Sequence, residues 1–163
     1  MCSSDLGQQT LAKLAGYVAN LPNPAGDMIV TRLFDAPRQL VWDAWSKPEM
    51  MRKWWGPKHF TTPVADLDFR KGGAYRIVMR APDGSDFPFH GHFLEVDPID
   101  RIVFDSIIEN LKDTQLVSTV TFTEEGKKTR VTVRQQRPAD PTAAAGQFQG
   151  WSETLEKLAA ALR

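Results

Sequence analysis

The chain has 163 residues, of which 20 are Lys or Arg and 20 are Asp or Glu, so its formal net charge at pH 7 is zero. This length is typical of one domain with a hydrophobic core of its own. A balanced charge gives no global attraction to nucleic acid or to an anionic membrane, and the longest apolar runs fall short of the roughly 18 residues that a spanning helix needs. We therefore expect no nucleic-acid partner and no membrane partner.

Cys2 is the only cysteine, so the chain cannot form an intrachain disulfide. A lone thiol fits a reducing compartment, and the N-terminus has no basic region followed by the apolar block of a signal peptide. These features predict a cytoplasmic location.

Residues 1–27 are interpreted as a tail or linker. The stretch CSSDL within residues 1–7 resembles the translation of a sequencing-adapter fragment, in which case Met1 is not the natural start. Residues 11–20 could form a short helix, and residues 21–27 are rich in Pro, Gly and Asn, as linkers are. We expect a single domain over residues 28–163.

The domain begins with a predicted strand, DMIVTRLFDA, followed by the short amphipathic helix RQLVWDAW. Pro37 suits the first turn of that helix, and Asp35 is a candidate cap.

A second short helix is predicted in SKPEMMRKWWG, where Ser46 and Glu49 have the spacing of a capping box and Gly56 ends the helix. Trp54 and Trp55 would occupy its last turn. Adjacent side chains on a helix point about 100° apart, so we expect one tryptophan to pack inward and the other to line an edge.

The pattern then changes to the two-residue period of strands. Six strands are predicted: FTTPVADLDF, GAYRIVMR, DFPFHGHFLEV, RIVFDSII, LVSTVTFT and TRVTVRQQ. Their short connections imply antiparallel neighbours, and the alternation implies one buried and one solvated face. Arg76, Arg80, Arg130 and Arg134 are expected on the solvated face, with an anionic-partner patch as the alternative.

A long helix over residues 141–162 is predicted to cover the buried face, with Asp140 and Pro141 at its start. Its apolar stripe consists of Ala144, Phe148, Trp151, Leu155, Leu158 and Leu162. Gly146 and Gly150 each cost this helix roughly 1 kcal/mol relative to alanine. Close packing is the favoured explanation for them, and room for a ligand is the alternative.

Five ordered stretches carry a family resemblance: TRLFDAPRQLVWDAWSKPE, KWWGPKHFT, DFRKGGAYRIVMRAPDG, GHFLEVDPIDRIVF and GWSETLEKLAAAL. Together they resemble bacterial proteins related to the C-terminal domain of the activator of Hsp90 ATPase, in the SRPBCC or START/Bet v 1-like superfamily. The resemblance implies an α+β helix-grip fold, in which a curved antiparallel sheet of about seven strands wraps around the C-terminal helix, with two short helices after the first strand. It also implies a cavity for apolar or amphipathic small molecules.

Candidate ligand-binding residues are the aromatic, apolar and inward polar side chains expected around that cavity. They are Trp42, Trp45, Trp54, Trp55, Phe60, Tyr75, Ile77, Met79, Phe87, Phe89, His90, His92, Phe104, Ser118, Val120, Gln135, Phe148 and Trp151. For any single aromatic residue, packing in the core is the favoured role, whereas a pocket role is favoured for the group as a whole.

His90 and His92 lie two apart on a predicted strand and share a face, which is half of a metal site. The local sequence offers no third ligand, so we expect no metal and no cofactor. The pair could instead hydrogen-bond at the pocket wall or lie exposed on the strand.

The sequence contains no GxSxG, P-loop, GxGxxG or HExxH motif. A small-molecule binding module, monomeric or homodimeric, with an apolar or aromatic ligand is therefore the favoured function. A cavity enzyme of the cyclase, dehydratase or hydrolase type is the alternative, and an Hsp90-linked interaction is a second alternative that depends on the family name alone.

Overall fold

The computed structural model describes residues 26–109, 115–138 and 141–163. The predicted tail at 1–25 and the predicted cap Asp140 lie outside these residues. The elements in chain order are β1 (Met28–Phe34), α1 (Arg38–Ser46), α2 (Pro48–Met51), β2 (Thr61–Leu67), β3 (Ala74–Arg80), β4 (Asp86–Asp97), β5 (Arg101–Ile108), β6 (Leu116–Glu125), β7 (Lys128–Gln135) and α3 (Pro141–Ala161).

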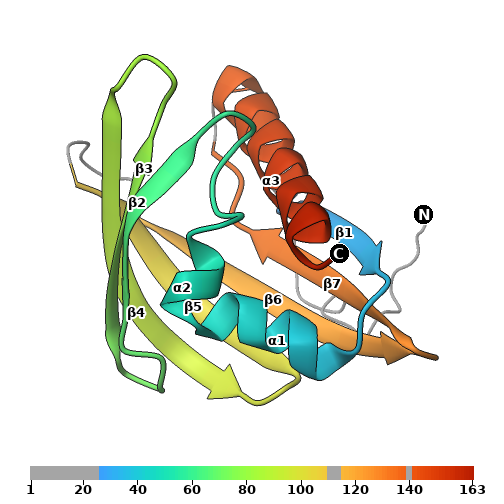
Figure 1. Cartoon of the computed structure of the whole chain (residues 1–163). Helices are drawn as coiled ribbons and strands as arrows, with labels where there is room; N and C mark the ends of the chain where they lie inside the picture. Colours follow the sequence, from blue (N-terminus) through green and yellow to red (C-terminus); the bar gives the residue numbers. More distant parts are fainter. Residues whose placement is uncertain (1–25, 110–114, 139–140) are drawn as a thin grey trace.

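The seven strands form one antiparallel sheet in the order β1-β7-β6-β5-β4-β3-β2. The sheet curls into a half-barrel, α3 lies across its hollow side, and α1 and α2 lie at the other end of that hollow (Figure 1). This arrangement confirms the predicted helix-grip fold.

Alternation along the strands explains which face the sheet buries. On β6, Ser118, Val120 and Phe122 are buried, whereas the residues between them are partly accessible. Their partners on β7, Gln135, Val133 and Val131, are buried as well. The core therefore lies between the hollow face of the sheet and the helices.

The starts of the short helices differ from the predictions. Pro37 is the N-cap of α1 and Lys47 is the N-cap of α2, and neither helix has a side-chain cap hydrogen bond. The predicted caps, Asp35 and the Ser46–Glu49 box, are therefore wrong. Because Ser46 still belongs to α1, it cannot begin the next helix.

Helix α3 packs its C-terminal half against the sheet through Leu155 and Leu158, which are buried. The predicted stripe continues to Phe148, but that side chain is 52% exposed. In the part of the chain that the structure describes, no helix is both long and apolar enough to span a membrane.

Candidate ligand-binding cleft

Described residues of the helices and of the hollow face of the sheet line an inner cavity and a larger, more open space. The inner cavity measures only about 20 Å³, which is about the room that one water molecule needs. It is lined by Trp45, Met51, Trp55, Leu67, Phe69, Tyr75, Ile77, Phe93, Ile102 and Phe104. The aromatic interior predicted as a ligand cavity is thus almost filled by its own side chains.

The larger space, which we call the cleft, has a volume of about 280 Å³ and opens beside the N-terminal half of α3. Its lining consists of Trp55, Gly56, Pro57, Met79, Ile108, Gln135, Gly146, Gln147, Gly150, Trp151 and Thr154. Ligand pockets in proteins usually measure about 300–1,000 Å³. The cleft is therefore sized for a small ligand of one or two rings.

The glycines of α3 explain why the cleft exists. A Cβ atom at Gly146 would meet nothing within 4 Å, and one at Gly150 would meet only Pro57 Cγ at 3.8 Å. Close packing, the favoured explanation from sequence, is therefore wrong. Apart from Trp151, the residues of α3 that line the cleft are small or polar, so they leave the space beside them open.

The segment after α2 forms one wall of the cleft. The backbone N–H groups of Trp54 and Trp55 donate to the carbonyl of Met51, so the chain makes one further turn beyond the end of α2. Trp54 is fully buried and donates its indole N–H to the Ala44 carbonyl over 3.0 Å. Trp55 is also buried, which corrects the expected edge position, and it lines both spaces.

A lysine of α3 fixes this wall. The ammonium group of Lys157 donates to the backbone carbonyls of Trp55, Pro57 and Phe60 over 2.9–3.3 Å. Partial burial lowers the pKa of Lys157. One turn earlier, the Glu153 carboxylate accepts a hydrogen bond from the backbone N–H of Lys58 at 3.1 Å. Sequence reasoning missed Lys157, because no motif links a helix lysine to a distant loop.

Tryptophan rings pack against one another behind the cleft. The ring centroid of Trp151 lies 5.5 Å from that of Trp55, in an edge-to-face arrangement. It lies 6.2 Å from that of Trp45, on which the Trp151 ring stacks. Aromatic pairs of this kind contribute more stabilising free energy than the burial of their apolar area alone would. The apolar wall of the cleft is therefore held rigid by the core behind it.

Polar groups form a hydrogen-bonded network that we call the amide cluster. Gln135, Gln147 and Trp151, which contributes its indole N–H, line the cleft, and Ser118 is their buried partner. Gln135 donates to the Ser118 hydroxyl at 2.7 Å and accepts from Gln147 at 2.6 Å and from Trp151 at 3.2 Å. The inward orientation predicted for Ser118 and Gln135 is confirmed by their burial. Gln147 and Thr154 were missed, although their spacing of four and three residues from Trp151 places them on its face of the helix.

The candidate residues fall into four groups. Trp45, Trp55, Tyr75, Ile77, Met79, Phe104, Gln135 and Trp151 line one or both spaces. Trp42, Trp54, Phe89, Ser118 and Val120 are buried but line neither space. The ring centroids of Phe60 and Phe87 lie 5.9 Å apart, and the Phe87 side chain is 43% exposed. His90, His92 and Phe148 lie away from both spaces.

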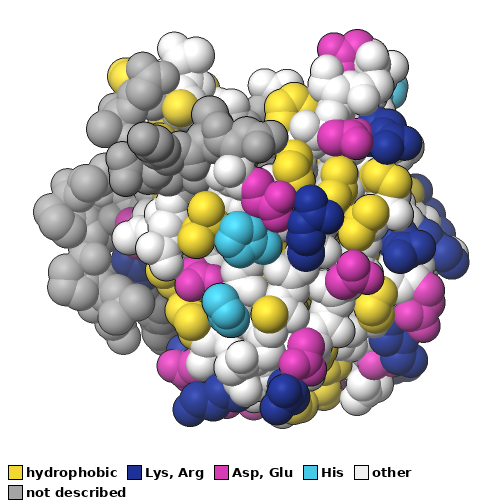
Figure 2. Space-filling model, turned by 90° about the vertical axis from the view of Figure 1, so that its left-hand side faces the viewer, with side chains coloured by type: hydrophobic (Ala, Val, Ile, Leu, Met, Phe, Trp, Pro, Cys, Tyr) yellow, Lys and Arg dark blue, Asp and Glu magenta, His cyan; other side chains and the backbone are white. Residues whose placement is uncertain are grey.

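His90 and His92 lie on the outer face of the sheet, because Phe89, Gly91 and Phe93 occupy the buried positions of β4. Figure 2 shows this outer face, with histidine side chains among interspersed acidic and basic side chains. Their assignment to the pocket wall is therefore wrong, and the alternative, exposed polar residues of the strand, is correct.

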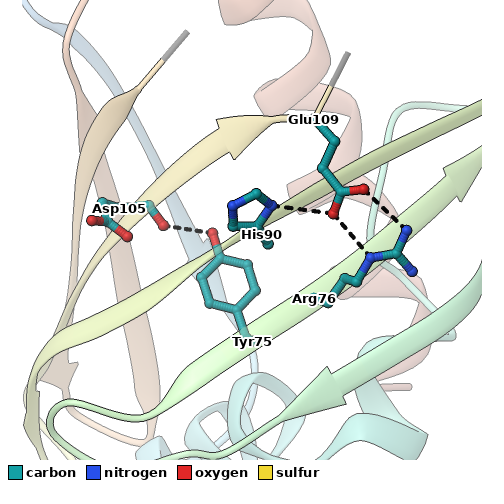
Figure 3. Close-up of polar contacts among 5 residues, drawn as sticks. All are labelled: Tyr75, Arg76, His90, Asp105 and Glu109. Atoms are coloured by element: carbon teal, nitrogen blue, oxygen red, sulfur yellow. Dashed lines mark hydrogen bonds and ion pairs between the residues drawn. The ribbon is translucent and has the colours of Figure 1, made fainter. Parts of the chain in front are cut away.

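The surroundings of His90 are ionic. The Glu109 carboxylate accepts two hydrogen bonds from Arg76 and lies 3.1 Å from His90 Nδ1 (Figure 3). The Arg76 guanidinium, and then His90, hold the pKa of Glu109 below its ordinary value. Tyr75 points away from this group and donates to the Asp105 carbonyl at 2.7 Å. Within the described residues, no group of three or more potential metal ligands occurs.

Each of the four outer arginines pairs with a carboxylate. The pairs are Arg76–Glu109, Arg80–Asp86, Arg130–Glu125 and Arg134–Asp27. Arg134 is only 5% exposed, so it is not a solvated residue as predicted. Paired arginines do not form a positive patch, which argues against the anionic-partner alternative.

Solved structures with the same fold come from several bacteria. A protein from Nitrosomonas europaea is 28% identical, with 83% of this chain and 93% of that chain covered and a TM-score of 0.73. A protein from Chromobacterium violaceum is 29% identical, with coverages of 85% and 96% and a TM-score of 0.73. The AHSA1 protein from Silicibacter pomeroyi, at 22% identity, coverages of 84% and 97% and a TM-score of 0.73, is similar in fold.

A search of curated proteins gave no match. The sequence pattern of one family matches residues 35–163, which is most of the chain and includes every residue that lines the cleft. The chain therefore belongs to the family described as Activator of Hsp90 ATPase homolog 1-like protein.

Proposed function

We propose that the protein binds a small, neutral, apolar or aromatic molecule in the cleft. The observation that carries this proposal is the cleft itself, a space of about 280 Å³ where two helix glycines leave room between Trp151, Trp55 and Met79. The family and its helix-grip fold support a ligand-binding type of domain in general.

The lining favours binding over catalysis. Every described residue that lines the cleft is uncharged at neutral pH. General acid–base chemistry needs a titratable group within hydrogen-bond reach of the substrate. The nearby ammonium group of Lys157 already donates to three carbonyls of the cleft wall. The amide cluster can orient a ligand by hydrogen bonds but has no acid or base to move a proton.

The family name refers to Hsp90, but membership in a fold family does not by itself transfer an activity. No feature of the described residues favours a co-chaperone role over ligand binding in the cleft. The cytoplasmic location and the monomeric or homodimeric state stay predictions.

A titration with naphthalene, followed through the tryptophan indole signals in ¹H–¹⁵N NMR spectra, tests the proposal. The signals of Trp55 and Trp151 should shift with a dissociation constant in the micromolar range. Trp42 serves as an internal control, because it packs against Phe69 and Phe122 and lines neither space. Unchanged Trp55 and Trp151 signals at saturating naphthalene would refute the proposal.

A further inference from the structure

The amide cluster has a fixed orientation, because two of its partners can play only one role. The indole N–H of Trp151 can only donate, so the atom of Gln135 that it meets must be the oxygen Oε1. The backbone carbonyl of Gln136 can only accept, so the atom of Gln147 that lies 2.7 Å from it must be the nitrogen Nε2. Neither amide can be flipped without placing two acceptors or two donors against each other.

The side-chain donors that Gln147, Trp151 and Thr154 offer beside the cleft are already used. Gln147 Nε2 has two protons and donates one to Gln135 Oε1 and the other to the Gln136 carbonyl. Trp151 donates its only indole proton to Gln135, and the Thr154 hydroxyl donates to the Gly150 carbonyl at 2.7 Å.

One acceptor has no partner. Gln147 Oε1 is shielded from solvent and accepts no hydrogen bond among the described residues, although the Gln147 side chain lines the cleft. A buried acceptor without a donor carries the full cost of its lost hydration. This oxygen loses no hydrogen bond to water when a ligand donor binds it. The new hydrogen bond should therefore stabilise the complex more than one that merely replaces a hydrogen bond to water.

From this count of donors and acceptors we infer that the cleft selects neutral ligands that carry a hydroxyl or N–H donor at one end of an apolar, aromatic body, with Gln147 as the specificity-determining residue. The inference rests on the proposed function of the cleft. This selection requires that a bound ligand reach Oε1 through the part of the Gln147 side chain that lines the cleft. A ligand whose polar end only accepts hydrogen bonds, such as an ether, meets donors of Gln147, Trp151 and Thr154 that are already used.

Three probes of similar shape test this inference: naphthalene, 2-naphthol, which has a donor, and 2-methoxynaphthalene, whose oxygen only accepts. Affinities are measured by the same NMR titration of indole signals. The wild-type protein should bind 2-naphthol about 3- to 10-fold more tightly than 2-methoxynaphthalene, as expected for one neutral hydrogen bond.

The variant Gln147→Met keeps the length of the side chain and removes the acceptor, so the ratio of the affinities for 2-naphthol and 2-methoxynaphthalene should fall to about 1. Gln149→Met is the matched control, because Gln149 is exposed on the same helix and contacts Glu153 instead of the cleft. This control should keep the preference.

Equal affinities for 2-naphthol and 2-methoxynaphthalene in the wild-type protein would overturn the inference and leave the proposed function standing. A preference that survives in Gln147→Met would also overturn it, because the donor would then bind elsewhere. If no probe binds, the proposed function and the inference fail together. The wild-type comparison decides the matter even if Gln147→Met does not fold.

Discussion

Replacement of the two glycines of α3 by alanine tests whether the cleft is real. A glycine inside a helix costs about 0.8–1.0 kcal/mol relative to alanine. Because an added Cβ at Gly146 meets nothing and one at Gly150 makes only an ordinary contact with Pro57, no steric cost offsets this gain. The double variant should therefore raise the free energy of unfolding by about 2 kcal/mol.

For a chain of this size, each 1 kcal/mol corresponds to a shift in melting temperature of roughly 2–4 °C, so the double variant should melt about 4–8 °C higher. Differential scanning calorimetry and urea unfolding measure both quantities. Gly91→Ala is the contrasting control, since its Cβ would overlap the carbonyl oxygen of Asp105 in the neighbouring strand. That variant should be strongly destabilised.

A larger substitution at Gly150 tests whether naphthalene binds in the cleft. Gly150→Leu places a large side chain beside Trp151, where it should fill the cleft and abolish naphthalene binding while the protein stays folded. Loss of stability in Gly146→Ala and Gly150→Ala would show that the helix packs closely at these positions and that no cleft lies beside it.

Three further perturbations test the surroundings of the cleft. Trp54→Ala should lower the free energy of unfolding by roughly 3–5 kcal/mol in urea titrations, because it removes a fully buried ring and its bond to Ala44; a loss under about 1 kcal/mol would contradict this packing. Lys157→Met should cost about 1–3 kcal/mol and weaken naphthalene binding, since three carbonyls of the cleft wall lose their donor; unchanged urea unfolding would show that the wall does not need the lysine. Glu109→Gln should be less stable than the wild type at pH 7, and the difference should shrink at pH 3. The pKa of Glu109 is lower in the folded than in the unfolded state, so the ionised carboxylate stabilises the fold at pH values above its unfolded-state pKa of about 4.3. This stabilisation is lost as the pH falls through the folded-state pKa. The same stability difference between wild type and variant at both pH values, measured by thermal unfolding, would refute the role of the ion pair.

Much of the fold could be predicted because local patterns and tertiary packing agree. The alternation on β6, where Ser118 and Val120 face the core, is sufficient to identify the buried face of the sheet. The stripe through Leu155 and Leu158 likewise predicts the face of α3 that meets the sheet.

The errors arise where two faces of an element look alike. Strand β4 carries aromatic side chains such as Phe89 on one face and His90 and His92 on the other, and both sets suit a pocket. The paired strands decide between them, and the sequence does not reveal that pairing. Phe148 shows a related limit, because helical periodicity predicts a face but not how far the sheet extends beneath it.

The cleft itself depends on distances between elements. Nothing in the sequence shows that the inner cavity is nearly filled while space remains beside Gly146 and Gly150. Gln147 is a candidate because the fold places its amide against Gln135 and the Gln136 carbonyl, and no sequence pattern predicts those contacts.

A crystal structure of the protein soaked with 2-bromonaphthalene shows where the ligand binds, because anomalous scattering locates the bromine independently of the fitted ligand. A bromine peak is expected in the cleft, beside Trp55 and Trp151 and next to the glycine face of α3. Binding in solution with the bromine on the outer face of the sheet, or in an expanded inner cavity beside Tyr75, would contradict the proposal that the cleft is the binding site.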